Sequence, residues 1–95
     1  MNNIKVFKLV TGEEIIAEVF NWFDAFVELK NPAVIVMQQT QQGVGVGLMP
    51  FMPYSTGNIK VYRVSLVSEA EPDVKMINEY SRIFGSGIQI ANTLP

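Results

Sequence analysis

Hydrophobic residues recur at every second position through the first third of the chain, which is the period of a half-buried β-strand. The pattern covers residues 5–10, 14–20 and 25–29, and the apolar side chains of each segment fall on one face. Short polar turns separate the segments, and the first turn contains Gly12. Three consecutive strands with aligned apolar faces predict an antiparallel meander that begins a small barrel.

Strand-like segments continue to about residue 66. The third strand extends past Asn31-Pro32, and because proline cannot donate to a ladder, we expect a bulge, a kink or an edge there. Gly43, Gly45 and Gly47, around the start of the next strand, are expected to let it bend sharply or approach another backbone closely. The remaining elements are an extension of the third strand at residues 34–37, a polar loop at 38–43, a fourth strand at 44–54, a turn at 55–58 and a fifth strand at 59–66.

The spacing of apolar residues changes to that of a helix in the last quarter of the chain. Pro72 stands where a helix can begin, and the acidic Glu71 and Asp73 suit the positive end of its dipole. Gly85 is a natural stop. The order of elements is therefore five strands followed by one helix.

These patterns predict a mainly β fold in a single domain over residues 1–95. Its parts are a small, five-stranded, strongly bent antiparallel barrel at about residues 4–67, a C-terminal α-helix at about 72–85 and a tail at 86–95.

The composition is unusually apolar for a small domain. Apolar residues make up 48% of the chain and charged residues only 17%. No apolar run reaches the roughly 18 residues of a spanning helix, and the N-terminus lacks the charged start and apolar block of a signal peptide. We therefore expect a cytoplasmic protein without membrane contact, whose apolar surface is covered by further copies of itself.

Several classes of function are disfavoured by missing residue types. The chain contains no cysteine and no histidine, which removes thiolate metal sites, the commonest general base and the commonest transition-metal ligand. We expect no catalytic residues, no cofactor and no metal. The net charge is −2 and the seven Lys and Arg are dispersed, whereas a duplex-DNA binder carries a basic stripe. Any nucleic-acid contact must come from a local site, or from one repeated around a ring.

The order of strands and a set of spaced residues resemble the Sm and Sm-like family over about residues 4–66. The first family motif resembles Leu9, Gly12, the alternating Ile15, Ala17 and Val19, and then Asp24, Phe26, Val27 and Glu28. The second motif, Arg-Gly-Asn/Asp between the last two strands of the family, reads Thr56-Gly57-Asn58 here. The fold implied is an Sm-like or SH3-like barrel.

The resemblance implies a homo-oligomeric ring of about five to seven subunits that binds single-stranded RNA or DNA, more often RNA, at its pore. Phe26 would stack a base, Asp24 would order the loop that holds it, and Gly57 with Asn58 would bring backbone and amide groups to the same pocket. Glu28 stands where the family has an Asn that bonds the base, and Thr56 stands where it has an Arg. The candidates for phosphate contact are Lys8, Lys30, Lys60 and Arg63.

A subunit interface is expected along the most apolar stretch of the chain, because methionine and aromatic residues are enriched in interface cores. The fifth strand, whose faces are both mixed, would lie between a core and a neighbouring subunit. The expected interface residues are Leu48, Met49, Phe51, Met52, Tyr54, Val61 and Tyr62.

A different class of function stays open. Phe26 would serve equally well as a subunit contact, and Asp24 as a side chain that closes a turn. The acidic composition, Glu28 and Thr56 favour a structural or adaptor protein, for example of a bacteriophage, that uses the barrel only for protein contacts. Independently of the function, the pair Trp22-Phe23 in a turn is expected either to pack on the C-terminal helix or to be exposed for a partner.

Overall fold

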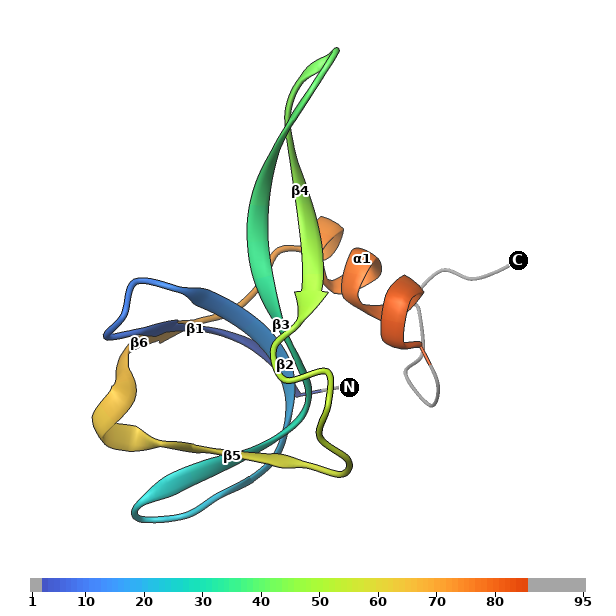
Figure 1. The fold of residues 1–95 in the computed structure, drawn as a ribbon. Coiled ribbons are helices and arrows are strands. Elements are labelled where there is room, and N and C mark those ends of the chain that lie inside the picture. Colours follow the sequence, from blue (N-terminus) through green and yellow to red (C-terminus); the bar gives the residue numbers. More distant parts are fainter. Residues whose placement is uncertain (1–2, 86–95) are drawn as a thin grey trace.

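The computed structural model describes residues 3–85 and confirms a mainly β fold with a C-terminal helix (Figure 1). The predicted tail at 86–95 lies outside the described residues. Within them, no helix is long and apolar enough to cross a membrane. The elements are β1 (Ile4–Leu9), β2 (Glu14–Trp22), β3 (Phe26–Thr40), β4 (Gly43–Pro50), β5 (Ile59–Tyr62), a 3-10 turn (Arg63–Ser65), β6 (Leu66–Ala70) and α1 (Val74–Phe84).

All six strands belong to one antiparallel sheet with the order β4-β3-β2-β1-β6, and β5 pairs with the first part of β3. The sheet curls strongly around its inner face (Figure 1). No ladder joins β5 to β6 in the part of the chain that the structure describes. The sheet is thus curled but not closed, and the five-stranded barrel is not confirmed.

The predicted fifth strand is divided in two because the chain changes partner within it. Residues 59–62 pair with β3, whereas residues 66–70 pair with β1. The 3-10 turn between them carries the backbone from one partner to the other, and the Ser65 carbonyl accepts a hydrogen bond from Val10 N at 2.8 Å. Local alternation of polar and apolar residues does not report such a change of partner.

The irregularity expected at Asn31-Pro32 is confirmed as a bulge in β3. The register with β2 shifts between the pairs Ile16↔Ala33 and Glu18↔Lys30, so β3 holds one more residue than its partner. Asn31 has φ 51°, in the left-handed region where asparagine is enriched. Beyond the bulge, β3 leaves the curled body.

The second half of β3 and the whole of β4 form a hairpin, residues 33–50, that projects from the body as an arm (Figure 1). The predicted polar loop at 38–43 is wrong, because strand pairing continues to Thr40↔Gly43 and leaves only a two-residue turn. Polar side chains are tolerated here because the tip is solvated on both faces. A Cβ at Gly47 would lie 2.7 Å from Nε2 of the Gln38 side chain, so this glycine leaves room for that side chain and not for another backbone.

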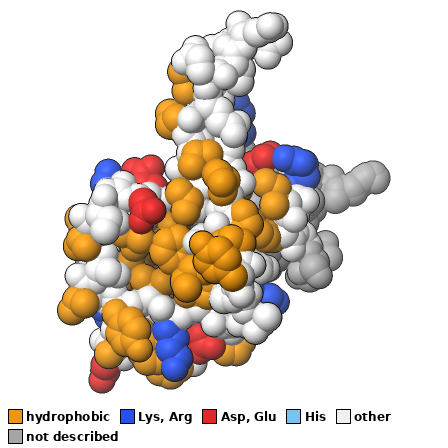
Figure 2. Space-filling view, in the orientation of Figure 1, with side chains coloured by type: hydrophobic (Ala, Val, Ile, Leu, Met, Phe, Trp, Pro, Cys, Tyr) orange, Lys and Arg blue, Asp and Glu red, His pale blue; other side chains and the backbone are white. Residues whose placement is uncertain are grey.

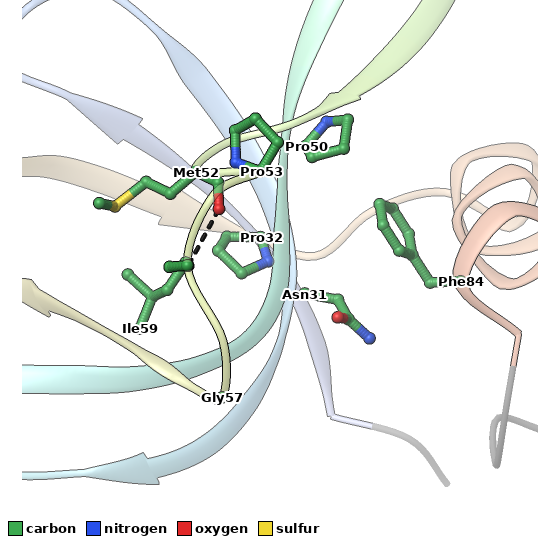
Figure 3. Close-up of a pocket in the computed structure, with 9 residues that line it drawn as sticks. Asn31, Pro32, Pro50, Met52, Pro53, Gly57, Ile59 and Phe84 are labelled. Carbon is green, nitrogen blue, oxygen red and sulfur yellow. Dashed lines mark hydrogen bonds between the residues drawn. The ribbon is translucent and has the colours of Figure 1, made fainter.

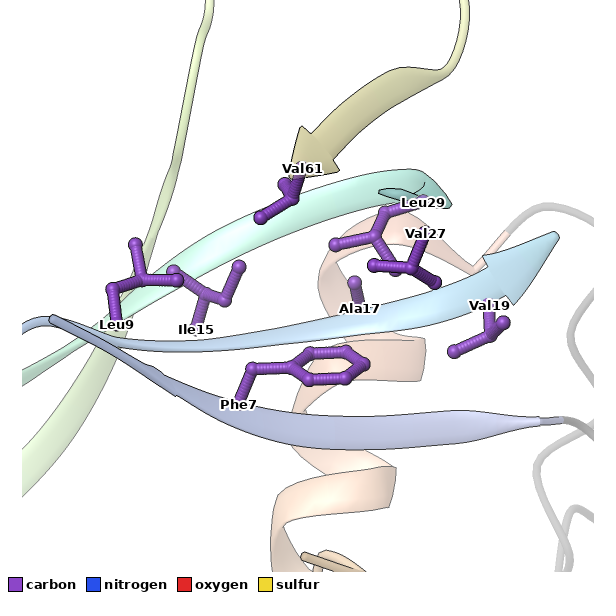
Figure 4. Packing of buried hydrophobic residues seen from close by; sticks show 8 residues of the cluster. All are labelled: Phe7, Leu9, Ile15, Ala17, Val19, Val27, Leu29 and Val61. Atoms are coloured by element: carbon purple, nitrogen blue, oxygen red, sulfur yellow. The ribbon is translucent and has the colours of Figure 1, made fainter. Parts of the chain in front are cut away.

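The inner face of the curled sheet encloses the larger of two hydrophobic clusters (Figure 4). Alternate residues of β1, β2, β3 and β5 point into it, which is the consequence of the period of two seen in the sequence. The buried members are Phe7, Leu9, Ile15, Ala17, Val19, Val27, Leu29 and Val61.

The second cluster lies on the outer face, where α1 packs against β1, β2 and β3. The helix begins after Asp73, whose carboxylate accepts a hydrogen bond from Met76 N at 2.9 Å and so caps the first turn. Tyr80 is fully buried against Ile4, Ile16 and Ala33. The helix predicted at about 72–85 is confirmed as Val74–Phe84.

The Tyr80 hydroxyl ties the helix to the bulge. Its single proton is shared between the carbonyl oxygens of Lys30 and Asn31, at 2.8 and 2.9 Å, and its oxygen accepts from Glu18 N at 3.2 Å. These backbone groups would otherwise lack partners where the bulge interrupts the ladder. One side chain therefore satisfies the polar groups that the irregular strand exposes.

We predict that Tyr80→Phe lowers the free energy of unfolding by about 1–3 kcal/mol, because it leaves buried polar backbone groups unpaired. Urea unfolding followed by tryptophan fluorescence measures this. The matched control is Tyr54→Phe, whose exposed side chain predicts a change below about 0.5 kcal/mol. Equal losses in the two variants would contradict the role assigned to the Tyr80 hydroxyl.

Stability should also fall at alkaline pH through the same group. Burial raises the pKa of the Tyr80 phenol above its ordinary value, so the unfolded chain ionises first, from about pH 10. The contribution of the protonated Tyr80 phenol to the free energy of unfolding is complete below that pH. It is lost as pH rises, and the free energy of unfolding then falls by at most about 1.4 kcal/mol per pH unit. Urea titrations between pH 9 and 11 should show a shallower decline for Tyr80→Phe than for Tyr54→Phe.

Candidate nucleic-acid interface

The ladder between β3 and β5 presents a regular outer face, here called the β3–β5 face. Phe26 lies opposite Tyr62, and Glu28 lies opposite Lys60. Alternate residues on both strands, among them Val27 and Val61, point into the inner cluster. The four outward residues therefore stand together on one surface of the body.

Three aromatic rings form a row at one end of this face. The Phe23 and Phe26 ring centroids lie 4.7 Å apart with an interplanar angle of 34°, and Phe26 and Tyr62 lie 5.6 Å apart. The Lys60 ammonium sits 5.2 Å from the Phe26 centroid, within cation–π range. Phe26 is half-buried by these neighbours, whereas Phe23 and Tyr62 remain 40% and 53% exposed. The free aromatic surface thus belongs to the outer two rings, with Phe26 as their support.

A carboxylate and an amide stand at the other end of the face. Asn58 Nδ2 donates to Glu28 Oε2 at 3.2 Å, and both side chains are half-buried. A carboxylate accepts hydrogen bonds and cannot donate them when ionised. The pair therefore offers free acceptor positions on Glu28 and one free N–H on Asn58, next to an aromatic surface.

Arg63 holds the turn between β2 and β3. Its backbone N–H donates to the Ala25 carbonyl at 2.9 Å, its Nε donates to the Phe23 carbonyl at 2.8 Å, and its guanidinium lies 4.9 Å from the Trp22 ring centroid. Asp24 is exposed, and its carboxylate makes no hydrogen bond within residues 3–85. The ordering role expected of Asp24 is therefore performed by Arg63 in this chain.

The segment Thr56-Gly57-Asn58 does not lie between the last two strands, contrary to the placement drawn from the resemblance. It precedes β5, and Arg63–Ser65 is the segment that joins β5 to β6. Gly57 has φ 76°, which glycine adopts without strain. Thr56 is exposed.

Gly57 lines a pocket of about 210 Å³ beside the foot of the arm (Figure 3). Pro32, Pro50 and Pro53 form part of its wall, and Phe84 faces them from α1. The pocket is small, and both polar and apolar groups line it, Asn31 and Ser55 among the polar ones. None of the outward residues of the β3–β5 face lines it.

The four candidates for phosphate contact do not all lie at the aromatic row. Lys60 and Arg63 contact the rings of the β3–β5 face and its turn. Lys30 is exposed on β3, two positions beyond Glu28. Lys8 stands on β1 and pairs with Glu14 at 3.6 Å, apart from the aromatic row.

The expected interface residues also differ in their exposure. Val61 is buried in the inner cluster, and Leu48 and Phe51 pack partly against the two clusters. The exposed members of the set are Met49, Met52, Tyr54 and Tyr62. Figure 2 shows hydrophobic side chains gathered at the foot of the arm, over the curled body.

One residue of the site, Phe23 in the aromatic row, was not assigned to it from the sequence. Arg63 was assigned to phosphate contact, and the structure shows in addition that it organises the turn. The pair Trp22-Phe23 in a predicted turn was the available signal, because a turn seldom needs two large aromatic residues. Trp22 packs edge-on against Phe7, with 5.9 Å between centroids, and not on the helix.

The described residues contain no cluster of three or more Asp or Glu side chains suited to a metal ion. The chemistry that the β3–β5 face offers is stacking, cation contact and hydrogen bonding. No protein-family model matches the sequence, and no curated protein matches it.

Proposed function

We propose that this chain is a non-catalytic subunit of a homo-oligomeric ring that binds single-stranded nucleic acid, RNA rather than DNA, on the β3–β5 face. The observation that carries the proposal is the row of Phe23, Phe26 and Tyr62 with Lys60 and Arg63 beside it. Aromatic surfaces with neighbouring cations are the usual means of holding unpaired bases and their phosphates.

Stacking supplies most of the binding energy in this account. A base on an aromatic side chain contributes about 1–3 kcal/mol, and the exposed faces of Phe23 and Tyr62 can each take one. Lys60 has a flexible stem and can leave the Phe26 ring for a phosphate. Because the chain is acidic overall, affinity must come from this local cluster and from its repetition around a ring.

The proposed ring is supported by the surface of the arm. Residues 31–59 contain no charged residue, and the exposed apolar side chains of the arm are Met37, Val44, Val46 and Met49. Among residues 3–85, no strand pairs with the outer edge of β4 or with that of β6. Soluble proteins usually protect such edges with charges or a covering segment. We propose that β4 of one subunit pairs with β6 of the next.

The resemblance to the Sm-like family supports the same proposal through the order of the strands. In this account the curled sheet acts as the family's barrel, and the ring works in the cytoplasm, which is the host cytoplasm if the chain is encoded by a phage.

A second candidate function is a structural or adaptor protein that uses the same fold only for protein contacts. The uncharged arm favours it, because a projecting apolar and amide-rich hairpin suits insertion against another protein. The aromatic row would then be a protein contact.

We predict that Tyr62→Ala weakens binding to single-stranded oligonucleotides by about 5- to 100-fold, the cost of one lost stacking partner. Phe26→Ala should weaken it as well, because the outer rings lose their support. Fluorescence anisotropy with oligo-U, oligo-A and single-stranded DNA measures this at two salt concentrations, and affinity should fall as salt rises.

The control for these variants is Val74→Ala, an exposed apolar truncation on α1, which should leave affinity unchanged. Binding that is unaffected by both aromatic variants would exclude the β3–β5 face as the site. Binding to none of the oligonucleotides would favour the adaptor function.

We also predict that Val44→Lys or Met49→Lys reduces the oligomer to single subunits, because each places an unpaired charge in the proposed interface. Multi-angle light scattering should give a multiple of the 10.6 kDa chain mass for the unmodified protein and one chain mass for the variants. Val10→Lys, at an equally exposed valine in the β1–β2 turn, should leave the oligomer intact. A single-chain mass for the unmodified protein in dilute buffer would rule out the ring.

A further inference from the structure

The Glu28–Asn58 pair has unfilled hydrogen-bonding capacity beside the aromatic row. Glu28 is half-buried, and within the described part of the chain its carboxylate accepts only the bond from Asn58 Nδ2 at 3.2 Å. Lys60 lies opposite it in the ladder but forms no ion pair with it there. A carboxylate has about four lone-pair sites, so most of its capacity remains open.

The distance between the aromatic row and Glu28 determines which part of a bound base the carboxylate can contact. Tyr62 lies opposite Phe26, and Glu28 lies two positions along β3 from Phe26, so Tyr62 and Glu28 are diagonal neighbours on the same face, about 7–8 Å apart. The hydrogen-bonding edge of a base stacked on the aromatic row would reach a similar distance from the stacking ring. The carboxylate therefore stands where the edge of a stacked base arrives.

We infer that the β3–β5 face selects guanine, through its Watson–Crick edge, in single-stranded nucleic acid. The inference rests on the proposed function and names the base that this function would prefer. Guanine presents two adjacent donors, N1–H and the N2 amino group, which match the two oxygens of Glu28. Its O6 acceptor then lies toward the N–H of Asn58 that does not bond Glu28.

The other bases match this arrangement less well. Uracil presents acceptors at O2 and O4 on both sides of its single donor, so two of its three edge groups would face a carboxylate that can only accept. Adenine and cytosine each offer one amino donor next to a ring acceptor, which satisfies one oxygen of Glu28 and repels the other. Only guanine gives a bidentate contact, and bidentate contacts are the specific ones in base recognition.

Asn58 has two roles in this arrangement: it offers one N–H to the base, and its hydrogen bond to Glu28 orients the carboxylate. Its amide is held by Glu28, and Gly57 before it adopts a backbone conformation with φ 76° that places the segment at the start of β5. The same hydrogen bond that orients the amide also fixes the plane of the carboxylate. The carboxylate of Glu28 and the amide of Asn58 would therefore already be oriented before a base binds.

The test uses the full chain and labelled seven-residue uridine oligomers with one central position changed to guanosine, inosine, 7-deazaguanosine, adenosine or cytidine. Anisotropy should show binding about tenfold tighter for guanosine than for uridine. Inosine, which lacks the N2 amino group, should lose most of this preference, and 7-deazaguanosine, whose Watson–Crick edge is intact, should keep it.

The decisive variant is Glu28→Gln, with Glu14→Gln as a control that removes the same charge from the exposed pair with Lys8. Glu28→Gln should bring guanosine and uridine within about twofold of each other, because one carboxylate oxygen becomes a donor. Glu14→Gln should keep the tenfold preference. Urea unfolding confirms that both variants are folded.

The outcomes separate the two proposals. Measurable binding of all oligomers with no preference for guanosine, or a preference that survives in Glu28→Gln, overturns the guanine inference and leaves the binding function standing. No binding of any oligomer by the folded, unmodified chain overturns both.

Discussion

The long third strand is the element on which the rest of the molecule depends. β3 pairs with β2 from Val27 to Val34, on both sides of the bulge, with β5 before the bulge and with β4 beyond it. No other strand in residues 3–85 has three partners. The bulge at Asn31-Pro32 makes this possible, because it lets the strand leave the curled body without breaking its pairing to β2. Tyr80 then satisfies the backbone groups that the bulge exposes.

The bulge in β3 also separates the two proposed functional surfaces, the base-binding face and the subunit contact. The part before the bulge carries Phe26 and Glu28 on its outer face, with β5 supplying their partners. The part beyond it builds the uncharged arm. The proposed base-binding face and the proposed subunit contact are thus opposite ends of one strand, so a distortion at the bulge would alter the position of one relative to the other.

The sequence allowed the fold to be predicted wherever local pattern and tertiary environment agree. Alternation identified β1, β2 and the start of β3, and the helical spacing with Asp73 in front identified α1. Prediction failed where the environment overrides the pattern. Residues 38–43 are polar because the arm is solvated and not because the chain loops there, and the break in the fifth strand reflects a change of partner that no local signal reports.

The candidate site was predicted in part. Phe26, Glu28, Asn58, Lys60 and Arg63 do gather around the β3–β5 face. The sequence could not show that Arg63, forty positions from Phe23, would bond its carbonyl. It also could not show that Thr56-Gly57-Asn58 precedes the last two strands, since turn composition alone does not tell which strands a turn connects.

The absence of charge between Lys30 and Lys60 has a practical side as well. Trypsin cleaves only after lysine and arginine, so a complete digest would release the arm, with the loop and the start of β5 that follow it, as one peptide of residues 31–60. After chemical cross-linking to a neighbouring molecule, mass spectrometry could therefore assign any cross-link on that peptide to this half of the molecule. Cross-links on the aromatic turn fall in the preceding peptide and would be distinguished from them.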